Sequence, residues 1–125
     1  MIDHVSVTVR DLEGCARFYE AVLGTLGQRK LVTRPGIVGF GKTYPEFWLN
    51  ERRTMTAIDA DTGTHICFRG ASIKVVQAFH EAAVQSGGRS DGEPGPRQAT
   101  NGAYYAAFVR DPEGNKLEAA TFAAA

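Results

Sequence analysis

The chain has 125 residues, the length of one ordinary domain with a hydrophobic core. Its 14 basic and 14 acidic side chains cancel, so no net charge attracts nucleic acid or an anionic membrane surface. No apolar run approaches the roughly 20 residues of a membrane-spanning helix, and the first residues do not have the pattern of a signal peptide.

The first segment with a clear period is residues 5–9, where valines alternate with polar residues as in a half-buried strand. Asp11 is a candidate N-cap, and apolar residues then recur at helical spacing until Gly24 and Gly27. Further strand-like pieces follow at 28–34, 37–41 and 46–50.

The second half of the chain repeats the first at a shift of 61 positions, without a gap. The shift lays His65 on His4, Ser72 on Asp11 and Gly88 on Gly27, so the caps coincide, and Gly87-Gly88 is the expected stop of the second helix. The repeat predicts a strand at 64–69, a helix at 72–86, and strands at 103–109 and 116–122. Residues 87–102 are rich in Gly and Pro, which predicts a long loop with room for one short strand.

Each half therefore has the order β-α-β-β-β, and the predicted fold class is α+β. We expect one domain over residues 1–125, made of module one (about 1–50), a polar linker (about 51–62) and module two (about 63–122). Duplicated modules are expected to be related by a pseudo-twofold axis, which brings equivalent residues face to face.

Three side chains with metal-binding chemistry project from the strand faces that do not carry the helices. Where Val5 and Val7 pack beneath a helix, His4 points the other way, and the same alternation applies to His65 and to Glu118. Two imidazoles and one carboxylate form a ligand set that holds a divalent metal and leaves coordination positions open.

These histidines, together with the stretch Asp111-Pro112-Glu113-Gly114-Asn115-Lys116-Leu117-Glu118, resemble the vicinal oxygen chelate superfamily. That group includes glyoxalase I, the fosfomycin- and bleomycin-resistance proteins and extradiol dioxygenases. The resemblance covers nearly the whole chain and implies two βαβββ modules that form an open, incomplete barrel around a metal. It also implies that His4, His65 and Glu118 are the ligands of Zn, Ni, Mn or Fe, and that the protein is a homodimer.

The resemblance also shows a difference. A fourth ligand position, occupied by Glu or His in glyoxalase I, corresponds here to Trp48, whose indole cannot bind a metal. Glu118 is then the candidate catalytic base as well as a ligand, since no other carboxylate is evident on this face.

Five further residues are candidates for substrate contact: Trp48, Tyr105, Arg97, Ser6 and Cys67. Each has a structural alternative. Trp48 and Cys67 could belong to the core, one of Tyr104 and Tyr105 should pack inside, and Arg97 could be a solvated loop residue. The remaining histidine, His80, lies in the second helix and is expected to be solvated.

Three functions remain open for this sequence. The first is a metal-dependent lyase or isomerase that acts on a small substrate through neighbouring oxygens. The second is an Fe(II) extradiol-type dioxygenase, and the third is a metal-free, ligand-sequestering protein of the bleomycin-resistance type. Two cysteines in separate segments, Cys15 and Cys67, fit a reducing compartment, so we expect a cytoplasmic protein.

Overall fold

The computed structural model describes residues 1–59, 61–100 and 102–123. The elements of the first half are β1 (Val5–Val9), α1 (Leu12–Gly24), β2 (Arg29–Arg34), β3 (Ile37–Gly41) and β4 (Pro45–Glu51). Those of the second half are β5 (His65–Arg69), α2 (Ile73–Gln85), β6 (Arg89–Ala99), β7 (Gly102–Arg110) and β8 (Lys116–Thr121). None of the described helices is long and apolar enough to cross a membrane.

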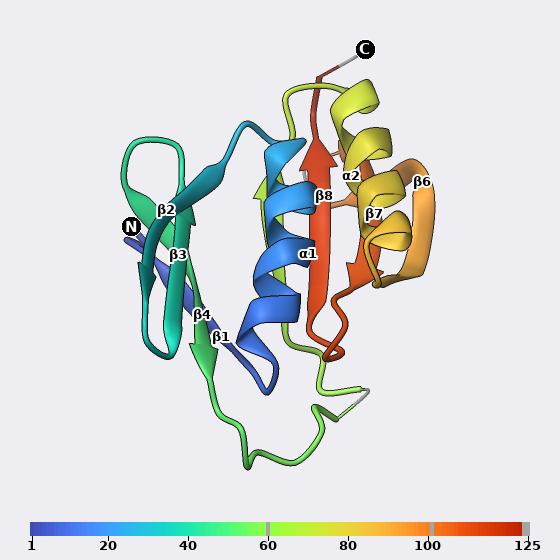
Figure 1. Ribbon diagram of the computed structural model, residues 1–125. Coiled ribbons are helices and arrows are strands. Elements are labelled where there is room, and N and C mark those ends of the chain that lie inside the picture. The colour runs from blue at the N-terminus through green and yellow to red at the C-terminus, as the bar shows by residue number, and fades with distance from the viewer. Residues whose placement is uncertain (60, 101, 124–125) are drawn as a thin grey trace.

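The two halves have the same topology. The strand orders are β1-β4-β3-β2 and β5-β8-β7-β6, and in each sheet the first and last strands of the module pair in parallel. Figure 1 shows the two sheets on either side of α1, with α2 covering the second sheet. The sheets do not close into a barrel, so the predicted α+β class and open architecture are confirmed.

The helix ends form as the sequence predicts. The side chain of Asp11 accepts a hydrogen bond from Gly14 N at 3.1 Å, and that of Ser72 accepts one from Val75 N at 3.2 Å. After the helices, Gly27 and Gly87 have φ values of 80° and 103°, a conformation that favours glycine. The predicted duplication is thus visible in the local chemistry of both modules.

Because both caps make the same bond, their removal should have similar effects. We expect Ser72→Ala and Asp11→Ala each to lower the free energy of unfolding by about 1 kcal/mol. Urea denaturation followed by circular dichroism measures the change, with Ser86→Ala, at the other end of α2, as the control for Ser72. A loss at Ser72 no larger than that at Ser86 would contradict the assigned cap.

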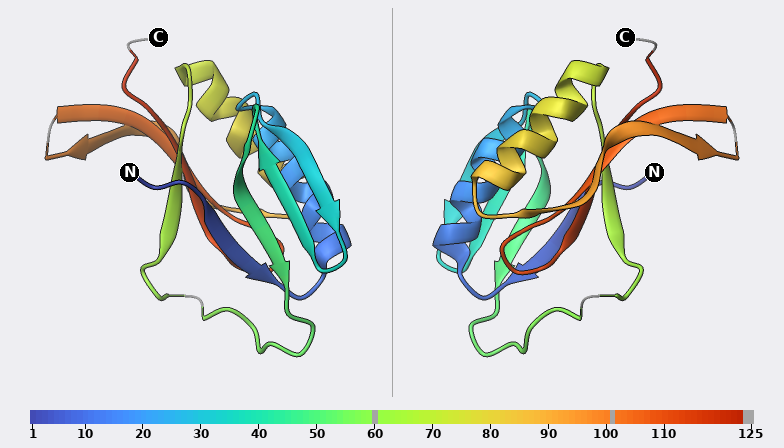
Figure 2. Two further views of the ribbon diagram at one scale, coloured as in Figure 1. Left: turned by 90° about the vertical axis from the view of Figure 1, so that its left-hand side faces the viewer. Right: turned by 90° about the vertical axis from the view of Figure 1, so that its right-hand side faces the viewer.

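The Gly- and Pro-rich segment differs from the prediction. Instead of a long loop with room for a short strand, it contains the 11-residue strand β6, which pairs with β7 and has register shifts near Gly92 and Gly95. β6 is an edge strand, where Pro94 and Pro96 are tolerated because the outer N–H groups need no partner. Figure 2 shows β6 and β7 projecting beyond the body of the molecule.

Both helices lie on one side of the strands and bury the main core beneath them. Tyr19 of α1 joins the modules because its hydroxyl donates a 2.6 Å hydrogen bond to buried Asp111, in the turn before β8. Across the same boundary, the rings of Phe47 and Phe68 lie 5.4 Å apart between centroids. The modules therefore share one continuous core.

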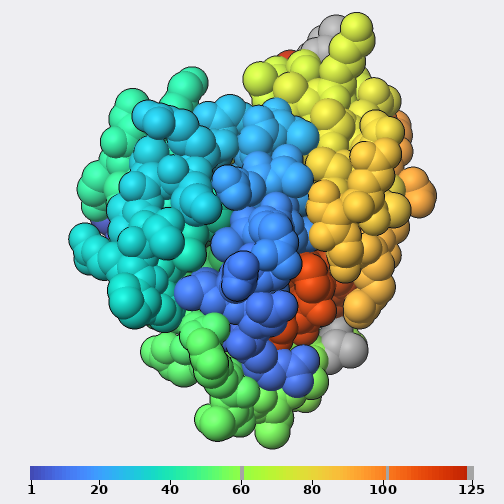
Figure 3. Space-filling view, viewed as in Figure 1, coloured from blue at the N-terminus to red at the C-terminus, as the bar shows by residue number. Residues whose placement is uncertain are grey.

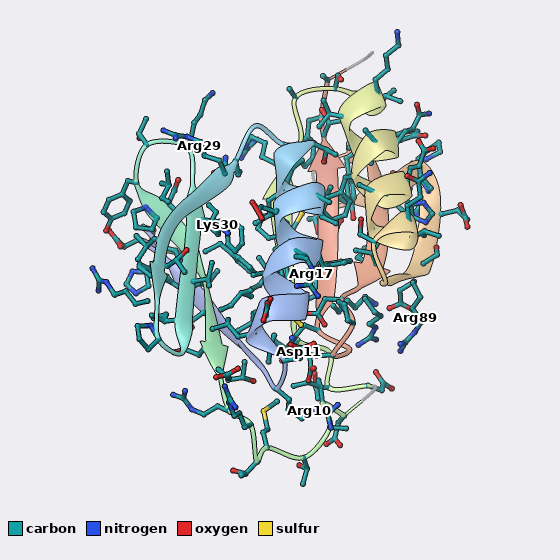
Figure 4. The ribbon with its side chains drawn as sticks, viewed as in Figure 1. Arg10, Asp11, Arg17, Arg29, Lys30 and Arg89 are labelled. Carbon is teal, nitrogen blue, oxygen red and sulfur yellow. The ribbon has the colours of Figure 1, made fainter. Side chains whose placement is uncertain are left out.

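The helix side of the molecule is polar outside this core. In Figure 3, α1 occupies the middle of this face, between the β2–β3 hairpin and α2. Figure 4 labels Arg17 on α1 and Lys30 on β2, and each of these residues forms an ion pair with an acidic residue of α1, Glu13 and Glu20 respectively. Two basic side chains of this face are thus paired with acidic residues of α1.

Candidate metal centre

A histidine and a glutamate meet on the sheet face away from the helices. β5 and β8 run in parallel, with Cys67 opposite Glu118 in register, and His65 lies two pairs earlier and so on the same face. The distance from His65 Nε2 to Glu118 Oε1 is 3.0 Å. The Glu118 side chain is only 6% exposed, whereas that of His65 is 38% exposed, so a buried carboxylate adjoins an accessible imidazole.

Two further polar groups surround the Glu118 carboxylate. Burial of the sulfur, together with the negative charge of Glu118, raises the pKa of the Cys67 thiol to about 12. Burial and then the same carboxylate also raise the pKa of the Tyr104 hydroxyl. Both groups therefore stay protonated near neutral pH and are available to donate hydrogen bonds to Glu118.

The remaining surroundings are aromatic and basic. The Phe108 ring lies edge-on to His65, with 5.8 Å between centroids. Lys116 Nζ and the Arg97 guanidinium lie 5.0 Å and 5.8 Å from the centroid of the Phe108 ring. Arg97 is therefore part of β6 and beside the candidate site, although its guanidinium also donates to the carbonyls of Glu93 and Pro96.

His4 lies elsewhere. Its Nδ1 atom is 2.7 Å from Asp3 Oδ1, and it lines a pocket with Phe68 and Arg69 at the end of β5, whereas His65 lines a hollow with Val7. β1 and β5 therefore run in opposite directions along the boundary between the two sheets. This places the two histidines towards opposite ends of that boundary. Within the described residues of one chain, no group of three His, Cys, Asp or Glu side chains could hold a metal.

Trp48 lies on the predicted face of its sheet. It pairs in register with Ser6, and both are on the side away from the helices. The indole lies against Gly39 of β3, where an added Cβ would come within 2.7 Å of the ring. Ser6 is exposed and its hydroxyl contacts the side-chain amide of Asn50. Trp48 is half-buried and does not belong to the cluster of core residues.

Some expectations about individual residues need correction. Tyr105 packs against the core and its hydroxyl accepts from Gln77 of α2 at 3.1 Å, so the tyrosine beside Glu118 is Tyr104. Cys67 is exposed as a residue, although its sulfur is partly shielded beside Glu118, and it is not a buried core thiol. His80 is buried, with its Nε2 atom 2.7 Å from Ser90 Oγ, and is not solvated.

Phe108 and Lys116 were not identified from the sequence as part of this site. The signal that could have found them is strand register. Phe108 is opposite Glu118, and Lys116 is opposite His65, so each shares the face of its partner. An alternating pattern is needed to derive such a register, and β7 has Tyr and Ala on both faces.

Residues 1–119 match the family model of the Glyoxalase/Bleomycin resistance protein/Dioxygenase superfamily. A glyoxalase/bleomycin resistance protein from Albidiferax ferrireducens T118 is 33% identical, with 95% of this chain and 97% of that chain covered and a TM-score of 0.85. A glyoxalase/bleomycin resistance protein/dioxygenase family enzyme from Burkholderia phytofirmans PsJN is 16% identical, with 98% of each chain covered and a TM-score of 0.73, which shows the fold alone. No curated protein matches the sequence.

Proposed function

Because the chain belongs to the Glyoxalase/Bleomycin resistance protein/Dioxygenase superfamily, we propose that it is a metal-dependent, glyoxalase-like enzyme. The reaction would be that of a lyase or isomerase on a small substrate that binds the metal through neighbouring oxygens. One observation carries the proposal: the 3.0 Å approach of His65 Nε2 to the buried Glu118 carboxylate on an open sheet face. The free cysteines fit the cytoplasmic location that we propose with it.

The donor atoms of this pair fit a divalent metal. An imidazole nitrogen and a carboxylate oxygen are ligands of Zn, Ni, Mn and Fe, and His65 and Glu118 already direct them at the same space. The described part of one chain brings no third such group to them. We therefore propose a homodimer in which His4 of the partner subunit completes the site.

A bound metal would supply a Lewis acid that stabilises negative charge on the substrate oxygens. Side chains of the protein would orient the catalytic carboxylate, accept the proton and enclose the substrate. Cys67 and Tyr104, held in their neutral forms, would donate to Glu118 and fix its orientation. Glu118 would accept a proton from the substrate, and Phe108, with Lys116 above its ring, would form one wall of the site.

Trp48 is proposed as the second wall, which gives a planar or apolar substrate a surface for stacking. We expect Trp48→Ala to weaken ligand binding about tenfold and to leave metal content unchanged, because indole is not a ligand. Gly39→Ala should have a similar effect on ligand binding by displacing the ring, whereas Gly24→Ala, where a Cβ meets no atom within 4 Å, is the control. Calorimetric titration measures ligand binding in every variant, because Trp48 is the single tryptophan and its fluorescence is lost in Trp48→Ala. Metal analysis of the same variants measures their metal content.

Metal analysis of the purified protein is the experiment that tests the proposed function. About one Zn, Ni or Mn ion per chain supports a lyase or isomerase, whereas Fe(II) with oxygen-dependent turnover supports the extradiol-type dioxygenase. A protein that binds none of these ions after supplementation is not a metalloenzyme. The candidate function is then ligand sequestration of the bleomycin-resistance type, which a largely apolar pocket between the two sheets favours.

A further inference from the structure

A pocket of about 260 Å³ opens at the seam between the two sheets, where β1 begins and β5 ends. Its floor is formed by apolar side chains from both modules: Val5, Leu23, Leu26, Phe40, Phe47, Ile66 and Phe68. The volume lies just below the roughly 300–1,000 Å³ of pockets that bind drug-sized ligands. Neither His65 nor Glu118 lines this pocket, although His4, which is proposed to complete the metal site of a second subunit, lies at its rim.

The rim of the pocket is polar. Val5 pairs with Phe47 on the helix side, so their neighbours His4 and Glu46 belong to the opposite face, and Arg69 follows Phe68 in the same alternation. The floor therefore reaches in towards α1, while the polar groups surround the mouth. A ligand that fits this arrangement has an apolar body and a polar head.

Two charges of the rim have no partner. Asp3 accepts from the Tyr44 hydroxyl at 2.7 Å and contacts His4, so its carboxylate is already engaged. Within residues 1–59, 61–100 and 102–123, neither Glu46 nor Arg69 takes part in an ion pair, and both are exposed. The mouth thus offers one free carboxylate and one free guanidinium.

We propose that this seam pocket binds an apolar α-amino acid, or a zwitterion of the same form. The Arg69 guanidinium receives the ligand carboxylate in a two-point hydrogen bond, and Glu46 accepts from the ligand ammonium group. The ligand side chain enters the floor between Phe47 and Phe68. A ligand with a single charge would satisfy only one side of the rim, which is the basis of the selectivity.

Calorimetric titration of the full chain tests the proposal with L-phenylalanine, L-leucine and three analogues. We expect saturable binding of both amino acids. 3-Phenylpropanoate lacks the ammonium group and phenethylamine lacks the carboxylate, so each should bind about tenfold more weakly than L-phenylalanine. Glycine, which has no apolar side chain, should show no binding.

Charge variants locate the two contacts. Arg69→Gln should weaken L-phenylalanine about tenfold and leave phenethylamine unchanged, while Glu46→Gln should weaken L-phenylalanine and leave 3-phenylpropanoate unchanged. Both side chains are exposed, so the variants should fold, as circular dichroism will verify. Arg29→Gln, an exposed arginine outside the pocket, should bind like the native protein.

His65→Ala separates this proposal from the proposed metal function, because it removes a metal ligand and should leave amino-acid binding unchanged. Absence of saturable binding for both amino acids overturns the proposal. So does equal binding by the Arg69, Glu46 and Arg29 variants, or loss of amino-acid binding in His65→Ala.

Discussion

Replacing His65 with alanine, or Glu118 with glutamine, is expected to lower metal affinity more than about 100-fold. Loss of a group that hydrogen-bonds a metal ligand typically lowers metal affinity by about 10- to 100-fold, so loss of the ligand itself should lower it more. Metal content after dialysis and competition with a chelator measure the change. Tyr105→Phe is the matched control, because Tyr105 lies in the same sheet but bonds to Gln77 on the helix side.

The same experiment can show whether the site is shared between subunits. We expect His4→Ala to reduce metal content like His65→Ala, although His4 lies apart from the pair within one chain. Mixing His4→Ala with Glu118→Gln subunits should restore metal to one site in each mixed dimer. Full metal content in His4→Ala alone would contradict the assigned third ligand.

Metal affinity should also depend on pH in a defined direction. Histidine binds metals through its neutral imidazole, so protons compete with the metal and affinity should fall below about pH 6. Titration of metal binding between pH 5 and pH 8 measures this loss. Affinity that stays constant over this range would indicate ligands other than histidine.

The elements that the sequence predicts well are those fixed by local chemistry. The caps at Asp11 and Ser72 and the glycine stops at Gly27 and Gly87 depend on neighbouring backbone groups only, so their positions are readable from the chain. β6 is different, because pairing with β7 keeps Gly- and Pro-rich residues in a strand that their own propensities disfavour.

In the candidate site, too, the features set by local sequence were predictable and those set by tertiary arrangement were not. Alternation within β5 and β8 correctly puts His65 and Glu118 on one face, since a side chain's face follows from its parity alone. Parity does not say how far along a seam two strands are offset, so it could not reveal that His4 and His65 line different hollows. It also could not choose between Tyr104 and Tyr105, because both faces of β7 carry aromatic residues.

A large loss of folding stability is expected from replacing Asp111, which lies in the stretch that carries the family resemblance. Its side chain is 1% exposed overall and accepts hydrogen bonds from the Tyr19 hydroxyl at 2.6 Å, from Glu113 N at 2.9 Å, and from the backbone and side-chain nitrogens of Asn115, both at 2.9 Å. Asp111→Ala leaves these donors without an acceptor in the interior. We expect the free energy of unfolding to fall by about 3–5 kcal/mol in urea denaturation.

Tyr19→Phe tests the same contact from the other module with a smaller change. Removing one donor of Asp111 should lower the free energy of unfolding by about 1–2 kcal/mol. Tyr44→Phe, which changes an exposed tyrosine bonded to Asp3, should lower it far less.

Burial raises the pKa of Tyr19 well above its usual value, and the Asp111 charge adds to this effect. Above about pH 10 Tyr19 therefore ionises only in the unfolded state, so native stability should fall as pH rises, and this slope should be smaller in Tyr19→Phe. Equal losses in the Tyr19 and Tyr44 variants, or an unchanged slope, would show that the Tyr19–Asp111 bond does not hold the two modules together.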